Sequence, residues 1–244
     1  MAHDTIGSFL FLEENEDVEL SALIKSLETE GWKIVRYDDG FEYEIGYDNR
    51  ATADTDILYT EIDDASSATL RMEKDEVKVR VGKNRDRMET CFSGPEFERS
   101  IGTNPGIEIT TVEYGLTRTN ATSKDLAQHR VGLYTSVVEK AAVLTDPIYG
   151  FGTYAVESLD ILTDRLPTID ELKRGGVQDI FWLNILSPVI LRALDQERVM
   201  TGPAWQIKEL SNGRIMVLTM DNPVEPGEDW IDGPNRLARH LGID

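Results

Sequence analysis

The sequence predicts an α+β fold with mixed or mainly antiparallel sheets and helices packed on one face, in two halves. Runs in which apolar and polar residues alternate are typical of half-buried strands, and they dominate the first half of the chain. Runs with apolar residues three and four positions apart are typical of helices, and they take a larger share of the second half. A chain of 244 residues is long enough to bury a sizeable core in one domain or two.

The strand-rich first half, residues 1–120, contains one clearly predicted helix. Leu20, Leu23 and Leu27 have helical spacing, and Gly31 follows them as a helix terminator. The predicted strands are 7–12, 32–38 and 41–47 (a hairpin around Asp39-Gly40), 56–62, 68–73, 76–82 and 107–115.

The second half, residues 121–244, follows a polar connector at 116–121 and finishes as helix, hairpin and helix. Thr168 and Glu171 have the spacing of a capping box, in which the two side chains satisfy free N–H groups at a helix start. Proline after an N-cap serine is a further start signal, found at Ser187-Pro188. The predicted elements are helices 122–144, 168–175, 187–202 and 232–242, a strand 178–186 and a hairpin 204–220.

The hairpin is the best specified element. Two alternating runs flank Asn212-Gly213, a pair favoured in type I′ turns. Burial should fix the register, because a shift of one residue would expose an apolar face that includes Ile207 and Val217. We expect Asn212→Pro to impair folding, since proline cannot adopt the positive φ that a type I′ turn needs at that position.

The charge balance is the most unusual property of the chain. Asp and Glu number 45 and Lys and Arg number 25, a net charge of −20, whereas a small domain typically carries a magnitude of about 2–8. Only nine of the 25 bases are lysines. We interpret this composition as adaptation to a salt-filled cytoplasm, as in halophilic archaea. An acidic face that captures a basic partner is the alternative, and the two can coexist. Nucleic acid is not an expected partner, because phosphate binding needs clustered Lys and Arg.

The first prediction follows from this charge. We expect the melting temperature to fall as ionic strength decreases, because carboxylates repel one another once screening is removed. The check is a series of thermal melts from dilute buffer to molar KCl. A flat response would remove the salt-adaptation hypothesis and favour the acidic-interface hypothesis.

The sequence offers no sign of export or of a membrane span. No apolar run approaches the ~20 residues that a spanning helix needs. The N-terminus lacks a basic region and acids soon follow its short apolar run, so we expect no signal peptide. Cys91 is the single cysteine, which excludes an intramolecular disulfide. We therefore expect a cytoplasmic protein.

Motifs that carry chemistry are few. The stretch 150–155 matches G-x-G-x-x-A, but it has no room for the preceding strand that a dinucleotide fold needs, so a glycine-rich turn or bulged strand is favoured. The acids at 54–56 and 63–64 lack the regular spacing of a cation-binding loop and are interpreted as solvated turn residues. No H-E-x-x-H, C-x-x-C or G-x-S-x-G occurs. We expect no catalytic residue, no metal and no cofactor.

The C-terminal part contains a series of structural motifs in a fixed order. They are Trp182-Leu183-Asn184, a helix from Ser187-Pro188 through Arg198, Pro203-Ala204-Trp205, the run IKELSNGRIMVLTMDNP and a small helix at 237–242. This order resembles immunity proteins of polymorphic and type VI toxin systems, and the resemblance covers about Tyr149–Asp244, under half of the chain. Two departures stand out: Ile185-Leu186-Ser187 occupies the place of an aromatic residue and a glycine, and Arg214 replaces a glycine.

The resemblance implies a non-enzymatic protein that binds and occludes a cognate toxin. The predicted contact residues are aromatic side chains next to acids, which are typical of interface hot spots. They are Tyr149, Phe151 and Tyr154 in one patch and Glu225, Glu228, Asp229 and Trp230 in an acidic loop. For Trp230 the alternative is packing under the last helix. Two other function classes stay open: a structural or regulatory module of a halophile, and a hydrolase without a local motif. The oligomeric state is open.

Overall fold

A computed structural model places one antiparallel sheet at the centre of the molecule. It describes residues 5–13, 18–37, 40–41, 43–45, 48–50, 54–84, 105–112, 124–154, 166–223 and 229–243. In these residues the sheet has 11 strands in the order β12-β13-β11-β10-β1-β9-β8-β7-β5-β6, with β2 on β7, and a separate pair β3-β4. The α+β class and the antiparallel sheet are confirmed.

The strands of both sheets, in chain order, are β1 (Thr5–Phe11), β2 (Lys33–Ile34), β3 (Arg36–Tyr37), β4 (Gly40–Phe41), β5 (Tyr43–Ile45), β6 (Asp48–Arg50), β7 (Ser67–Lys74), β8 (Val77–Asn84), β9 (Gly106–Val112), β10 (Tyr149–Thr153), β11 (Leu183–Leu186), β12 (Gln206–Glu209) and β13 (Ile215–Leu218). The helices are α1 (Leu20–Thr29), α2 (Thr55–Asp64), α3 (Lys124–Thr145), α4 (Ile169–Lys173), α5 (Pro188–Leu194), α6 (Gln196–Met200) and α7 (Asp229–Leu241).

The two sequence halves share this sheet. Strand β1 pairs with β9 on one side and with β10 on the other, so the first strand of the chain joins the N-terminal strands to the C-terminal ones. The sheet therefore continues across the division near residue 120, which itself falls outside the described residues.

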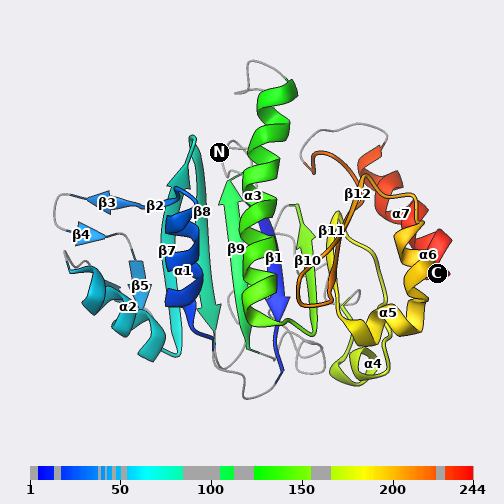
Figure 1. Cartoon of the computed structure of the whole chain (residues 1–244), viewed down its shortest axis with the longest axis horizontal. Helices are drawn as coiled ribbons and strands as arrows, with labels where there is room; N and C mark the ends of the chain where they lie inside the picture. The colour runs from blue at the N-terminus through cyan, green and yellow to red at the C-terminus, as the bar shows by residue number, and fades with distance from the viewer. Residues whose placement is uncertain are drawn as a thin grey trace.

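Helices lie on both faces of the sheet, as two separate buried clusters show. In Figure 1, α3 crosses the middle of the sheet. Leu10 of β1 belongs to a buried cluster with α1, α2 and α3, which we call the α3-side cluster. Its neighbours Phe9 and Phe11 point the other way, because successive side chains of a strand alternate between faces. They belong to a second cluster with α4, α5, α6 and α7, which we call the α7-side cluster.

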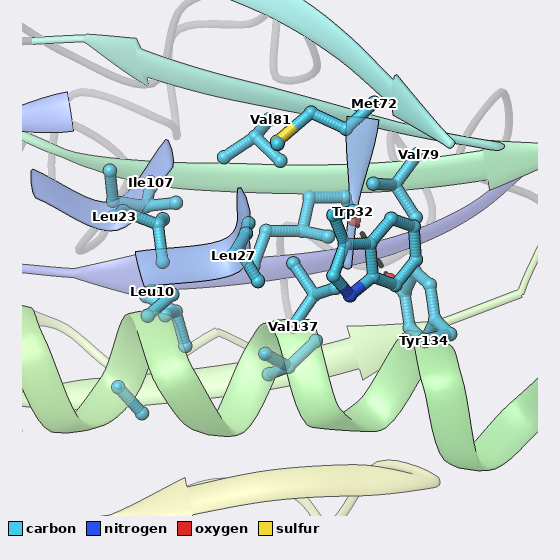
Figure 2. Packing of buried hydrophobic residues seen from close by; sticks show 14 of the residues in the cluster. Leu10, Leu23, Leu27, Trp32, Met72, Val79, Val81, Ile107, Tyr134 and Val137 are labelled. Carbon is cyan, nitrogen blue, oxygen red and sulfur yellow. Dashed lines mark hydrogen bonds between the residues drawn. The ribbon is translucent and has the colours of Figure 1, made fainter. Parts of the chain in front are cut away.

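Figure 2 shows the α3-side cluster, where apolar side chains of the sheet meet those of α1 and α3. Leu23 and Leu27 of α1, Leu10 of β1 and Val137 of α3 are all buried there. The Tyr134 hydroxyl donates to Ile109 O at 2.8 Å, which satisfies a polar group in the middle of this apolar layer.

One predicted strand is a helix. The segment 56–62 lies in α2, whose N-cap is Asp54 with its side chain accepting from the backbone N–H groups of Asp56 and Ile57. Leu58 and Ile62, four residues apart, face the core. The cap and this i, i+4 pair outweigh the alternation that favoured a strand.

The predicted helix 187–202 is broken in two. Asp195, between α5 and α6, has φ +66° and ends the first helix. Its side chain accepts from the backbone N–H of Glu197, which begins the second helix. The start at Ser187-Pro188 is confirmed, with proline in the first turn.

The type I′ turn predicted at Asn212-Gly213 is wrong. Gly213 has φ +77°, but Asn212 is not among the residues with positive φ. Gly213 N donates to Leu210 O and Leu210 N donates to Arg214 O, which makes a three-residue loop closed by a left-handed glycine. Asn212→Pro should still be harmful, because proline is disfavoured at the third position of such a turn and the Asn212 amide would be lost.

That amide belongs to a clasp between the hairpin tip and the end of α3. Asn212 Nδ2 donates to Ala142 O and to Asp146 Oδ1, each at 2.8 Å. Arg214 Nη1 donates to Asp146 Oδ1 and Arg214 Nε donates to Pro147 O, both at 2.7 Å. The hairpin is therefore tied to the turn that leads into β10, which explains why an arginine follows Gly213.

The capping box at Thr168 and Glu171 is confirmed. The backbone N–H of Thr168, the Gln178 amide and the Thr168 hydroxyl bond to the Glu171 carboxylate and lower its pKa below the usual 4.5. Because the folded-state pKa is lowered, this carboxylate contributes stability that is complete above the unfolded pKa and is lost as pH falls through the folded value.

We therefore expect Glu171→Gln to lower the melting temperature at neutral pH, and the difference to shrink as the pH falls below about 4. Paired thermal melts of the two proteins across acid pH measure this. A difference that stays constant into strong acid would show that the ionised cap is not its cause.

Candidate interaction surface

The first predicted contact patch is in the core. Tyr149 and Phe151 are 1% and 0% exposed and lie in the α7-side cluster. Strand β10 carries them between β1 and β11, so both of its edges are paired. Tyr154 is half-buried and packs against the α3-side cluster. The prediction that Tyr149 and Phe151 contact a partner is therefore wrong, because their side chains are enclosed by the fold.

The glycines of the G-x-G stretch have a packing role in β10. A Cβ at Gly150 would lie 2.6 Å from Leu10 Cδ2, and one at Gly152 would lie 2.9 Å from Leu183 Cβ. Neighbouring strands thus fill the space that larger residues would need. Residues 150–153 therefore belong to a strand and do not form a phosphate-binding loop.

The acidic loop is only partly described. Glu225 and Glu228 lie outside the described residues, while Asp229 and Trp230 open α7. This helix starts beside the end of β13, because a Cβ at Gly233 would lie 3.0 Å from Thr219 O. The segment 221–232 contains five acids and no Lys or Arg. The partner-binding role of this segment stays a prediction.

An exposed aromatic side chain lies directly before β12. Trp205 is 50% exposed and Met200, at the end of α6, is 39% exposed. Trp205 N donates to Leu218 O at 2.9 Å, so its backbone is held against the last residue of β13. Trp205 and α7 therefore both lie at the end of β13, through Leu218 and Thr219.

Local backbone geometry explains why Trp205 is exposed. Leu218 is the ladder partner of Gln206, yet its carbonyl also accepts from Trp205 N, so two residues oppose one. This is the arrangement of a β-bulge, which redirects a side chain and commonly occurs at sheet edges. Simple alternation would have placed Trp205 on the packed face together with Ile207. Alternation alone therefore gives no signal for this exposed residue.

Strand β12 is the edge of the sheet in the described part of the chain. Gln206, Lys208 and Glu209 are exposed and Ile207 is half-buried against the α7-side cluster. Lys208 Nζ lies 2.7 Å from Glu139 Oε2 of α3. The surface that we call the β12 surface consists of Met200, Trp205 and residues 206–209.

Two of the acids considered as cation ligands have structural partners. Asp54 caps α2, and Asp63 Oδ1 accepts from Ser21 N at 2.9 Å. Among the residues that the structure describes, no group of three or more His, Cys, Asp or Glu could hold a metal ion. Within the same residues, no helix has the length and apolar character of a membrane span. Cys91 lies outside the described residues.

A groove of about 870 Å³ lies between the end of α4, the end of α5 and the C-terminus. Glu171 and Arg174 are on its rim, and Val177, Leu194 and Ile243 contribute apolar surface. The lowered pKa of Glu171 is caused by its capping bonds, and it is the opposite of the raised pKa that suits a general acid at neutral pH. The groove therefore does not point to acid–base chemistry.

Comparison with known proteins identifies no family. No protein-family model matches the chain. No curated protein matches it either. Among solved structures it is similar to one described as Pseudomonas aeruginosa T6SS protein PA0821, with 10% sequence identity and a TM-score of 0.49 over 99% of this chain and 72% of that one. A similarity this distant carries no functional information.

Proposed function

We propose that the chain is a non-enzymatic, salt-adapted binding protein that protects a cell by occluding a cognate toxin, and that the β12 surface is its contact site. The observation that carries the proposal is Trp205, which is half exposed directly before the exposed edge strand β12. The sequence resemblance to immunity proteins supplies the class of partner. The acidic loop with Trp230 belongs to the same proposed site, because α7 begins at the same end of the sheet.

The energetics favour an aromatic anchor of this kind. A Trp side chain can bury up to ~250 Å², so covering the exposed half would stabilise a complex by ~2–3 kcal/mol at ~25 cal/mol/Å². Trp is enriched among hot-spot residues that are surrounded by polar groups. The residues that follow Trp205 on β12 include the exposed polar residues Gln206, Lys208 and Glu209.

The charge supports a basic partner. A net charge of −20 attracts cationic proteins and speeds their association at low salt. At molar salt the screening length is about 3 Å, so steering is suppressed and short-range contacts must supply the affinity. The exposed indole of Trp205 supplies such contacts under both conditions.

The test is made with the product of a neighbouring toxin-like gene. We expect that co-expression of this chain restores the growth of cells that produce the toxin, and that the two proteins elute as one complex in size-exclusion chromatography at molar KCl. Continued toxicity together with separate elution would contradict the proposal. An enzyme that modifies the toxin would restore growth without a stable complex, which separates that class from occlusion.

A further inference from the structure

We propose that the partner binds by adding an extended, basic segment of its own chain as a new strand along β12. This inference rests on the proposed function and specifies how binding occurs. Strand addition supplies main-chain hydrogen bonds for affinity and side-chain contacts for specificity. It is supported by the backbone of β12, by the position of Lys208 and by the net charge of the chain.

The backbone pattern shows which groups of β12 face outward. Leu210 N donates to Arg214 O at 2.8 Å, which makes these two residues a hydrogen-bonded pair. Hydrogen-bonded and non-bonded pairs alternate along an antiparallel ladder, so Gln206 and Lys208 direct their backbone groups to β13. Ile207 and Glu209 therefore direct N–H and C=O groups away from β13, toward the open edge.

Natural proteins protect exposed edges with short strands, lysines and covering segments. Strand β12 is short, at four residues, but the side chain of its lysine does not extend along the open edge. Lys208 bonds to Glu139 of α3, which places the ammonium over the sheet face and away from the edge. Glu209 accepts from Gln196 Nε2 at 3.3 Å, so its carboxylate is held near α6.

The net charge of −20 favours a basic segment. Among the described acids, Asp232 is exposed on α7 and Glu209 is exposed on β12 itself. The positive charge of Lys208 is neutralised by its ion pair with Glu139, so Lys208 does not repel a basic segment. Trp205 stands at the start of β12, where its indole can cover an apolar or cationic side chain of an added strand.

A pair of synthetic peptides tests strand addition with the intact chain. The probe is the capped hexapeptide (Lys-Val)₃, and its matched control carries N-methyl groups on every second residue, which keep the charge and block one hydrogen-bonding edge. In ¹⁵N NMR titrations at the lowest salt that keeps the chain folded, we expect the amides of Ile207 and Glu209 to shift. We expect the control peptide to bind about tenfold more weakly. Equal binding of both peptides, or shifts that leave β12 unchanged, would overturn the proposal.

Variants at Glu209 provide the matched test in the protein. Proline removes the outward N–H without touching the ladder to β13, while Glu209→Ala removes the same carboxylate and keeps the N–H. We expect Glu209→Pro to weaken peptide binding about tenfold relative to Glu209→Ala, with similar melting temperatures. Equal affinities would overturn strand addition.

The same two variants separate this inference from the proposed function. If the toxin complex and growth protection exist but Glu209→Pro binds the toxin as tightly as Glu209→Ala, the function stands and strand addition is wrong. If the peptide adds to β12 but no toxin complex forms, the edge is a strand-binding site and the immunity proposal is wrong.

Discussion

Replacing Phe151 by alanine should lower the free energy of unfolding by about 3–5 kcal/mol. The Phe151 side chain is fully buried, with its ring centroid 4.5 Å from that of Phe181, 5.3 Å from that of Phe9 and 6.0 Å from that of Phe11. Removing the ring leaves a cavity beneath α4 to α7, where the fixed strands β1 and β11 limit collapse. Denaturant unfolding at one fixed molar KCl concentration measures the change.

Phe151→Leu is the matched control, because it keeps most of the apolar volume and should cost clearly less than the alanine variant. A Phe151→Ala protein within about 0.5 kcal/mol of the parent would place the residue at the surface. In that case the aromatic patch first expected from the sequence would have to be reconsidered as a contact site.

Replacing Arg214 by alanine should lower the free energy of unfolding by about 2–3 kcal/mol, through loss of charge-assisted hydrogen bonds in a partly buried clasp. The guanidinium side chain is 12% exposed and bonds to the Asp146 carboxylate and to the Pro147 carbonyl. Asp146 has φ +47°, so the turn that Arg214 holds is a strained one. The same denaturant titration measures this effect.

Arg214→Lys is the control for geometry. Lysine keeps the charge but cannot bond to two groups through a planar fork, so its stability should fall between those of the parent and the alanine variant. If the lysine and alanine variants were equally stable, the loss of stability would come from the planar guanidinium geometry and not from the positive charge. An alanine variant as stable as the parent would contradict the clasp.

Much of the fold followed from periodicity and caps. The spacing of Leu20, Leu23 and Leu27 predicted α1, and the Thr168–Glu171 capping box is present as predicted. These signals are local, since a cap or a helical face is set within a few residues. The strand order is not local, and only the pairing of β1 with both β9 and β10 shows that the two halves share one sheet.

The errors have identifiable causes. The apolar pattern of segment 56–62 is compatible with a strand or a helix, and the cap by Asp54 favours the helix. The aromatic residues around Gly150 were interpreted as a surface patch. The missing side chain of Gly150 instead leaves room for Leu10, so that β10 can lie in the middle of the sheet. Trp205 was missed because a bulge reverses the orientation that alternation predicts.

The most direct test of partner capture on the β12 surface is the toxin affinity of Trp205→Ala, measured by calorimetry together with its melting temperature. We expect the variant to melt within a few degrees of the parent, because Trp205 is half exposed, and to bind the toxin more weakly by ~2 kcal/mol or more. Trp230→Ala, measured in the same way, tests the acidic loop as part of the site. A Trp205→Ala protein that melts far lower yet keeps its affinity would contradict the account, since the indole would then serve the fold and the contact site would lie elsewhere.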